Sequence, residues 1–301
     1  MIKEKKNLSN NLDESYKEAI RFAKKHYENF PVVSFLVPKS LAKHVAIIYW
    51  FARTADDMAD EGTLSGNERI KLLENFENDL KNSLIDNSGD IFKLALINTI
   101  REMNLSTENF FDLIKAFKQD VIKNRYNNFD EVLNYCRFSA NPIGRLILEL
   151  FGIRNDKAFL YSDKICTALQ LTNFYQDISI DYKKGRIYLA EDEMKEFSVP
   201  KNVFELNENN LNFKRLLKFN VDRTQNLFDE GKNLFKFLNG RLKFEIKWTV
   251  YGGEAILNKI RSSDFDSLQN RPKLSSIDFV KLFLKSLFIN DRPGKRNSEE
   301  K

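Results

Sequence analysis

Long segments with helical spacing of apolar residues are the feature that most restricts the fold of this chain. The six prolines and eleven glycines of the 301 residues lie mainly between these segments. Strict alternation of apolar and polar residues, which is typical of half-buried strands, is scarce. The sequence therefore predicts an all-α protein, with one helical domain over residues 13–289 around a central cavity. Polar segments, 1–12 and 290–301, flank this domain.

Seven segments carry the clearest helical pattern, at residues 39–61, 67–84, 106–123, 129–152, 156–182, 214–238 and 242–261. Pro142 and Gly144 fall inside one of them, so we expect a kink or break there. Ser106 or Thr107, followed by acids, predicts a capping box at the start of the segment 106–123. His44 is expected at the surface or at a helix cap.

Charge and cysteine content limit the partners and the compartment. A net charge of +5 suits an anionic substrate or an anionic membrane surface, but it is too small to indicate nucleic acid. Cys136 and Cys166 are too few for a disulfide framework, which favours a reducing cytoplasm. No stretch approaches the roughly 20 apolar residues of a membrane-spanning helix. We expect a cytoplasmic protein that at most rests on the inner face of a membrane.

Two apolar helices each carry one narrow polar stripe. The first stripe consists of Tyr49, Arg53, Asp56 and Asp60, and the second of Gln170, Asn173, Asp177 and Asp181. Each set recurs with helical spacing, so its members share one face. Because a helix that is apolar on its other sides is normally buried, the stripes should line an internal cavity. The alternative is that the acids form a solvated face or pair with Arg53, Lys183 and Lys184.

The acidic ends of the stripes are suited to Mg²⁺. Aspartates four apart on a helix have Cβ atoms about 6 Å apart, so both can reach one ion. Mg²⁺ is usually held by one or two carboxylates together with substrate phosphates. We expect two or three Mg²⁺ ions and a diphosphate at Asp56, Asp60, Asp177 and Asp181. Arg53 and the basic residues Lys183, Lys184 and Arg186 would help to neutralise the departing diphosphate.

With these motifs in view, the chain resembles the squalene/phytoene synthase family from about His26 to Arg271. Residues 49–61, YWFARTADDMADE, and residues 169–189, LQLTNFYQDISIDYKKGRIYL, are similar to the two aspartate-rich motifs of that family. The resemblance implies an isoprenoid-synthase-type bundle in which Tyr49, Arg53 and the four aspartates are catalytic. It implies substrate-binding roles for His26, Phe30, Tyr135, Gln170, Asn173, Arg186, Tyr188 and Tyr251.

Residues 26–38, 135–148 and 271–275 are similar to the branch of the family that makes hydroxysqualene for hopanoids. Condensing members usually carry a serine-rich segment where this chain has Glu28-Asn29-Phe30-Pro31. The resemblance implies that the protein ionises presqualene diphosphate, or another prenyl diphosphate, supplied by the presqualene diphosphate synthase of the same pathway. The cation would rearrange and capture water instead of hydride, so no NADPH is expected.

Aromatic faces stabilise carbocations. Tyr49, Phe30, Phe174 and Tyr251 are the candidates for this role, although ordinary core packing is an alternative for the phenylalanines.

Two other functions stay open. The chain could condense two prenyl diphosphates into presqualene diphosphate or phytoene, or it could be a non-catalytic assembly factor of the same fold.

The tail of the chain also allows two interpretations. Ile277, Val280, Leu284 and Leu287 fall on one side of a helical pattern that also contains Lys281 and Lys285. This segment could pack on the core or lie on a membrane as a basic amphipathic helix. Because the implied substrate is a lipid, we expect peripheral membrane contact.

Overall fold

The computed structural model describes residues 2–25, 37–86 and 89–288, and every regular element in these ranges is a helix. The all-α prediction is confirmed. The first five helices are α1 (Ile2–Lys25), α2 (Lys39–Asp60), α3 (Gly66–Asp86), α4 (Ile91–Glu102) and α5 (Glu108–Ile122). The others are α6 (Phe129–Ser139), α7 (Asn141–Leu150), α8 (Asp156–Gln176), α9 (Ile178–Lys183), α10 (Glu191–Glu196), α11 (Leu211–Gly231), η1 (Lys232–Lys236), α12 (Gly240–Ser262) and α13 (Ser276–Phe288).

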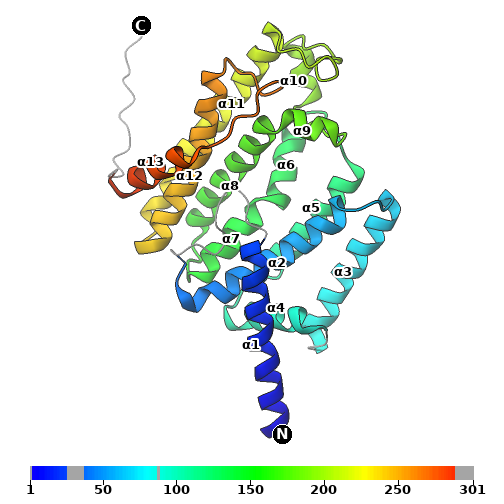
Figure 1. Cartoon of the computed structure of the whole chain (residues 1–301), viewed down its shortest axis with the longest axis vertical. Coiled ribbons are helices and arrows are strands. Elements are labelled where there is room, and N and C mark those ends of the chain that lie inside the picture. Colours follow the sequence, from blue (N-terminus) through cyan, green and yellow to red (C-terminus); the bar gives the residue numbers. More distant parts are fainter. Residues whose placement is uncertain (1, 26–36, 87–88, 289–301) are drawn as a thin grey trace.

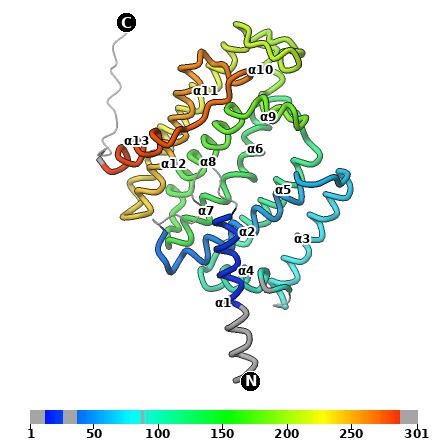
Figure 2. Tube along the Cα trace, viewed as in Figure 1, coloured from blue at the N-terminus to red at the C-terminus, as the bar shows by residue number. Residues whose placement is uncertain are grey.

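Two helices organise the bundle, α2 in the N-terminal half and α8 in the C-terminal half (Figure 1). Helix α2 packs against α1, α3, α4 and α5, whereas α8 packs against α6, α7, α11 and α12. Each half has its own cluster of buried apolar side chains, and Ile147 and Phe151 pack against both clusters. Figure 2 shows α1–α5 on one side of the molecule and α11–α13 on the other, with α7 and α8 between them. The two polar stripes therefore sit where the halves meet.

The break predicted near Pro142 is confirmed, because α6 ends at Ser139 and α7 begins at Asn141. Proline is tolerated in this first turn, where its missing N–H has no helical partner. Gly144 then allows a close approach of α7 to α8. A Cβ atom at this position would lie 2.4 Å from Ser162 Oγ and 2.5 Å from Cys166 Sγ.

The helix predicted over residues 156–182 is interrupted. Helix α8 ends at Gln176, and Asp177, with φ −105° and ψ 15°, separates it from α9. The backbone N–H groups of Ile180 and Asp181 both bond to the Asp177 carbonyl, at 2.9 and 2.8 Å. Because of this interruption, the acidic end of the stripe does not continue the straight face of α8.

Two smaller predictions are wrong. Thr107 caps α5 without a side-chain hydrogen bond, and a capping box forms instead at α3, where the Ser65 N–H and hydroxyl donate to Glu68 at 2.8 and 2.6 Å. His44 is buried, with 1% of its surface exposed, and its Nδ1 lies 2.9 Å from Thr99 Oγ1. The neighbouring α1 and α4 cover the side of α2 that carries His44, which the local sequence does not reveal.

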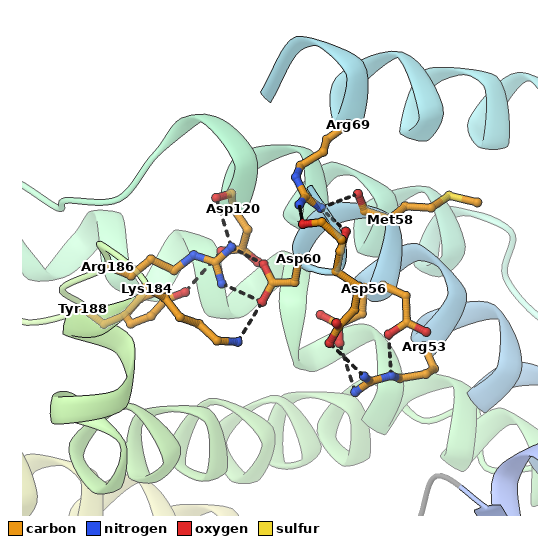
Figure 3. Close-up of polar contacts among 12 residues, drawn as sticks. Arg53, Asp56, Met58, Asp60, Arg69, Asp120, Lys184, Arg186 and Tyr188 are labelled. Atoms are coloured by element: carbon orange, nitrogen blue, oxygen red, sulfur yellow. Dashed lines mark hydrogen bonds and ion pairs between the residues drawn. The ribbon is translucent and has the colours of Figure 1, made fainter. Parts of the chain in front are cut away.

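The end of α2 is fixed by Arg69. Its guanidinium donates to the carbonyl groups of Met58, Glu61 and Gly62, at 3.3, 2.9 and 2.9 Å (Figure 3). A cation at this end satisfies carbonyls that lack helical partners and complements the helix dipole. Asp60, the last residue of α2, is thereby held at a defined place. Within the described ranges, no helix is both long enough and apolar enough to cross a bilayer.

Candidate active site

Two cavities adjoin between α2, α8 and α12. The more polar one has a volume of about 560 Å³, and the more apolar one about 320 Å³. Tyr49, Leu169 and Thr249 line both, so the cavities meet at these side chains. The polar cavity is also lined by Thr172, Asn173, Gln176, Arg271 and Lys273. The apolar one is lined by side chains such as Val45, Ile48, Ala52, Ile143, Ile147, Ile165 and Leu242. Together they offer a charged compartment next to a hydrocarbon-like one.

Asp60 of the first motif pairs with the basic residues that follow the second motif. Arg186 donates to both Asp60 carboxylate oxygens, one of them at 3.1 Å, and Lys184 reaches the carboxylate at 3.2 Å (Figure 3). Burial alone would raise the pKa of Asp60, but the hydrogen bonds and charges of Arg186 and Lys184 outweigh burial and lower it. Asp60 is therefore ionised at neutral pH.

Asp56 lies one turn before Asp60 and contacts Arg53 of its own helix. Arg53 Nη1 lies 3.4 Å from Asp56 Oδ2, and its Nε lies 2.8 Å from Asp57 Oδ1 (Figure 3). Arg53, Asp56 and Asp60 are all partly buried. The predicted pairing of acids with Arg53 and Lys184 is thus present, and it involves partly buried carboxylates. Of the four residues of the first stripe, Tyr49 is the one that lines the two cavities among the described residues.

The second motif places two carboxylates close together. Asp177 accepts hydrogen bonds from Arg271, one of them at 3.1 Å. Burial and the negative charge of Asp177 raise the pKa of Asp181 to about 7, despite opposing charges on Arg186 and Lys184. A bound cation would therefore offset this repulsion and stabilise the ionised form of Asp181.

Asp120 of α5 was not among the predicted site residues. It accepts hydrogen bonds from the hydroxyls of Tyr135, at 2.6 Å, and Tyr188, at 3.3 Å. Burial raises the pKa of Asp120 to about 6, although these hydrogen bonds and Arg186 oppose the shift. The sequence around Asp120, next to Gln119 on an amphipathic helix, does not indicate these hydrogen bonds, because the partners of Asp120 come from α6 and from the segment after α9.

Tyr135 and Tyr188 belong to an aromatic group in the wall of the site. The rings of Phe174 and Tyr188 stack with centroids 3.7 Å apart, and Tyr135 lies 5.9 Å from Phe174. Tyr135 and Phe174 are buried. None of these three aromatics is among the described residues that line the two cavities, but Phe174 and Tyr188 line a small separate cavity together with Asp181 and Arg186.

The face of α8 that lines the polar cavity differs by one position from the predicted stripe. Leu169, Thr172, Asn173 and Gln176 line the cavity, whereas Gln170 is half-buried outside that set. Gln176 is buried and donates to the carbonyl of Pro272 at 2.7 Å, which holds the 271–275 segment over α8. Packing of α8 against α7, α11 and α12 determines which of its faces meets the cavity.

Tyr251, predicted to bind substrate, is not among the described residues that line the two cavities. Its neighbours Gly252 and Gly253 line the polar cavity, while Lys285 Nζ lies 4.4 Å from the centre of the Tyr251 ring. The register of α12 turns the glycines toward α8 and the tyrosine toward α13. The predicted residues His26 and Phe30 lie outside the described residues.

The arrangement of the aspartates suits Mg²⁺ binding by pairs of carboxylates better than binding by a preassembled cluster of three or more. Within the described part of the chain, no group of three or more His, Cys, Asp or Glu side chains is arranged to hold a metal ion. Mg²⁺ commonly needs only one or two carboxylates, with water and substrate phosphates completing its shell. The crowded Asp177 and Asp181 carboxylates have the right chemistry for such a site.

A model of the squalene/phytoene synthase family matches residues 23–278. The chain belongs to the squalene/phytoene synthase family. It is 30% identical over 264 residues to the hydroxysqualene synthase of Rhodopseudomonas palustris, covering 87% of this chain and 88% of that protein. A crystal structure of squalene synthase HpnC from Alicyclobacillus acidocaldarius matches with 36% identity and a TM-score of 0.80, over 85% of this chain and 96% of that one.

A dehydrosqualene synthase crystallised with a ligand shares the fold, with a TM-score of 0.83 at 22% identity, over 93% of this chain and 98% of that one. As a member of the squalene/phytoene synthase family, the chain is an enzyme of isoprenoid biosynthesis, and family members act on prenyl diphosphates. The two joined cavities have the polarity that such substrates require.

Proposed function

We propose that this enzyme converts presqualene diphosphate and water into hydroxysqualene and diphosphate, with Mg²⁺ as its cofactor. The observation that carries the proposal is the junction of the two cavities at Tyr49, Leu169 and Thr249. A substrate with an anionic head and a branched hydrocarbon body needs both compartments at once. The similarity to a protein named hydroxysqualene synthase supports this choice of substrate and product.

The diphosphate would bind on the polar side. Asp56, Asp60, Asp177 and Asp181 would hold Mg²⁺, which neutralises the negative charge that builds up as a diphosphate departs. Arg271 and Lys273, which line the polar cavity, would bind phosphate oxygens through charge-assisted hydrogen bonds. Arg186 and Lys184 add positive charge near Asp60.

The hydrocarbon and the cation would lie toward the apolar cavity. Tyr49 borders both cavities, so its ring can face the cation while its hydroxyl faces the polar side. Asn173 lines the polar cavity and offers both a donor and an acceptor for the water that ends the reaction. Capture of water leaves a hydroxyl on the product and requires no hydride donor, so no NADPH is needed.

Condensation of two prenyl diphosphates is the second candidate, because the family includes phytoene synthases. The replacement of a serine-rich segment by Glu28-Asn29-Phe30-Pro31 favours rearrangement over condensation. We also propose a cytoplasmic enzyme that receives its substrate from the presqualene diphosphate synthase of the same pathway.

A two-substrate assay tests the proposal. The purified protein is given Mg²⁺ without NADPH, and either presqualene diphosphate or farnesyl diphosphate. Hydroxysqualene from the first substrate, with no turnover of the second, is the expected result. Turnover of farnesyl diphosphate alone would show that the enzyme condenses. The Asp56→Asn variant serves as the inactive control in both reactions.

A further inference from the structure

Helix α13 presents a row of exposed apolar side chains. The exposed fractions are 66% for Ile277, 59% for Val280, 47% for Leu284 and 53% for Leu287. Their spacing of i, i+3, i+7 and i+10 places them on one face of the helix. Single exposed apolar residues are common, but a contiguous row marks an interaction surface. We call these four residues the docking face.

The opposite side attaches α13 to the body of the protein. Leu282 is buried, and the Phe283 ring packs edge-on against Phe244 and Trp248 of α12, at 5.0 and 5.7 Å. Figure 1 shows α13 on the outside of α12, at the edge of the molecule. The helix is therefore held in place by one face while the docking face points away from α12.

The charge on this helix indicates the chemistry of the partner. Lys281 is exposed at the edge of the docking face, whereas Lys285 is exposed with its Nζ over the Tyr251 ring and Asp278 pairs with Lys259 at 3.0 Å. A lysine at the edge of an apolar strip favours a surface of anionic lipid headgroups. A second copy of the same face would bring like charges together, which disfavours a dimer. We propose that α13 docks the enzyme on an anionic lipid bilayer.

The docking face also adjoins the substrate site. Phe279, next to Val280 in sequence, lines the polar cavity, as do Arg271 and Lys273 of the segment that leads into α13. Docking through α13 would bring this cavity close to the bilayer that holds a water-insoluble substrate. This link to substrate delivery rests on the proposed function, whereas the docking itself rests only on the surface of α13.

Vesicle flotation without substrate tests the docking. The full chain is mixed with vesicles of phosphatidylcholine, with or without phosphatidylglycerol. The wild type should float with the anionic vesicles and much less with the neutral ones. The Val280→Glu/Leu284→Glu variant should bind anionic vesicles at least about tenfold more weakly, because it removes two apolar contacts and adds repulsion. Lys281→Gln should weaken binding about fivefold.

A matched control replaces two exposed apolar residues elsewhere, Ile85→Glu/Leu160→Glu, and should float like the wild type. Equal flotation of the α13 variant and the wild type would overturn the proposal, as would a wild type that ignores both vesicle types. Loss of a dimer in the α13 variant, seen by light scattering, would show that the face binds a second copy instead.

Turnover separates this proposal from the proposed function. The α13 variant should match the wild type when presqualene diphosphate is supplied in detergent, and should be slower when it is supplied in anionic vesicles. If the wild type floats but turns over no presqualene diphosphate, the docking stands and the proposed reaction is wrong.

Discussion

Arg186 donates to both carboxylate oxygens of Asp60, across 126 positions of sequence. The contact joins the end of α2 to the segment after α9, so it ties together the two aspartate motifs (Figure 3). Both side chains are mostly buried, at 15% and 20% exposure. The pair therefore fixes how the end of α2 lies against the segment after α9.

Replacement of Arg186 should loosen the site. Arg186→Gln leaves Asp60 partly buried with Lys184 alone, and we expect it to lower the free energy of unfolding by about 1–3 kcal/mol. Arg186→Lys keeps the charge but cannot form the two-pronged contact, so its effect should be intermediate. Urea unfolding measures both. Equal stability of all three proteins would mean that the ion pair contributes nothing.

The carboxylates proposed for Mg²⁺ should matter for turnover more than for folding. Asp56→Asn or Asp177→Asn should abolish conversion of presqualene diphosphate, because each removes a charged oxygen ligand. Helical content by circular dichroism and the melting temperature should change little, because both side chains are partly exposed. Glu205→Gln, at an exposed position, is the control and should be fully active. Activity in both aspartate variants would disprove the metal assignment.

Asp181 and Asp60 should respond to pH in opposite directions in metal-free protein. The pKa of Asp181 is raised to about 7 from 3.8, so the folded state keeps a proton that the unfolded chain releases. The contribution of Asp181 to the unfolding free energy of the wild type therefore falls as pH rises from about 4 to 7. Asp181→Asn removes that penalty and should raise the unfolding free energy at pH 8 by about 1–3 kcal/mol, with little effect at pH 4.

The matched variant is Asp60→Asn. The pKa of Asp60 is lowered from 3.8, so its contribution is present above that pH and is lost as pH falls through the folded value. Asp60→Asn should therefore destabilise the protein at pH 7. Melting curves at pH 4, 6 and 8 measure both variants, and shifts of the same sign at pH 8 would contradict the electrostatic account.

Asn173 should influence the end of the reaction. Asn173→Leu removes the amide that we propose orients water, so part of the cation should lose a proton and give a hydrocarbon instead of hydroxysqualene. Gln170→Leu, on the same helix but outside the cavity lining, is the matched control. Mass spectrometry of the products measures the ratio, and unchanged product from Asn173→Leu would remove this residue from the proposal.

The volume of the apolar cavity should limit the size of the hydrocarbon body that can bind. Ala52→Phe projects a ring into a space of about 320 Å³ and should lower kcat/KM for presqualene diphosphate by about tenfold or more. Ala52→Ser changes the volume little and is the control. If Ala52→Phe turned over the substrate normally, the hydrocarbon would have to lie elsewhere.

Local sequence was sufficient for the helical class and for the existence of the two motifs. Helical periodicity with few breakers predicted the helices, and the break near Pro142 was also visible, because these signals act over a few neighbouring residues. The spacing along the chain also selects Asp56, Asp60, Asp177 and Asp181 as candidate metal ligands, and that role stays a prediction.

Tertiary packing decided what these residues contact. It buried His44, interrupted the second stripe at Asp177, and turned Tyr251 toward α13 while the adjacent glycines face the cavity. It also brought Asp120 to Tyr135 and Arg271 to Asp177. A helix that is apolar on most sides can turn any of these sides toward a cavity. Only packing against neighbouring helices fixes its rotation about its own axis. The free energy that selects one arrangement comes from contacts between distant segments, which spacing along a single helix does not encode.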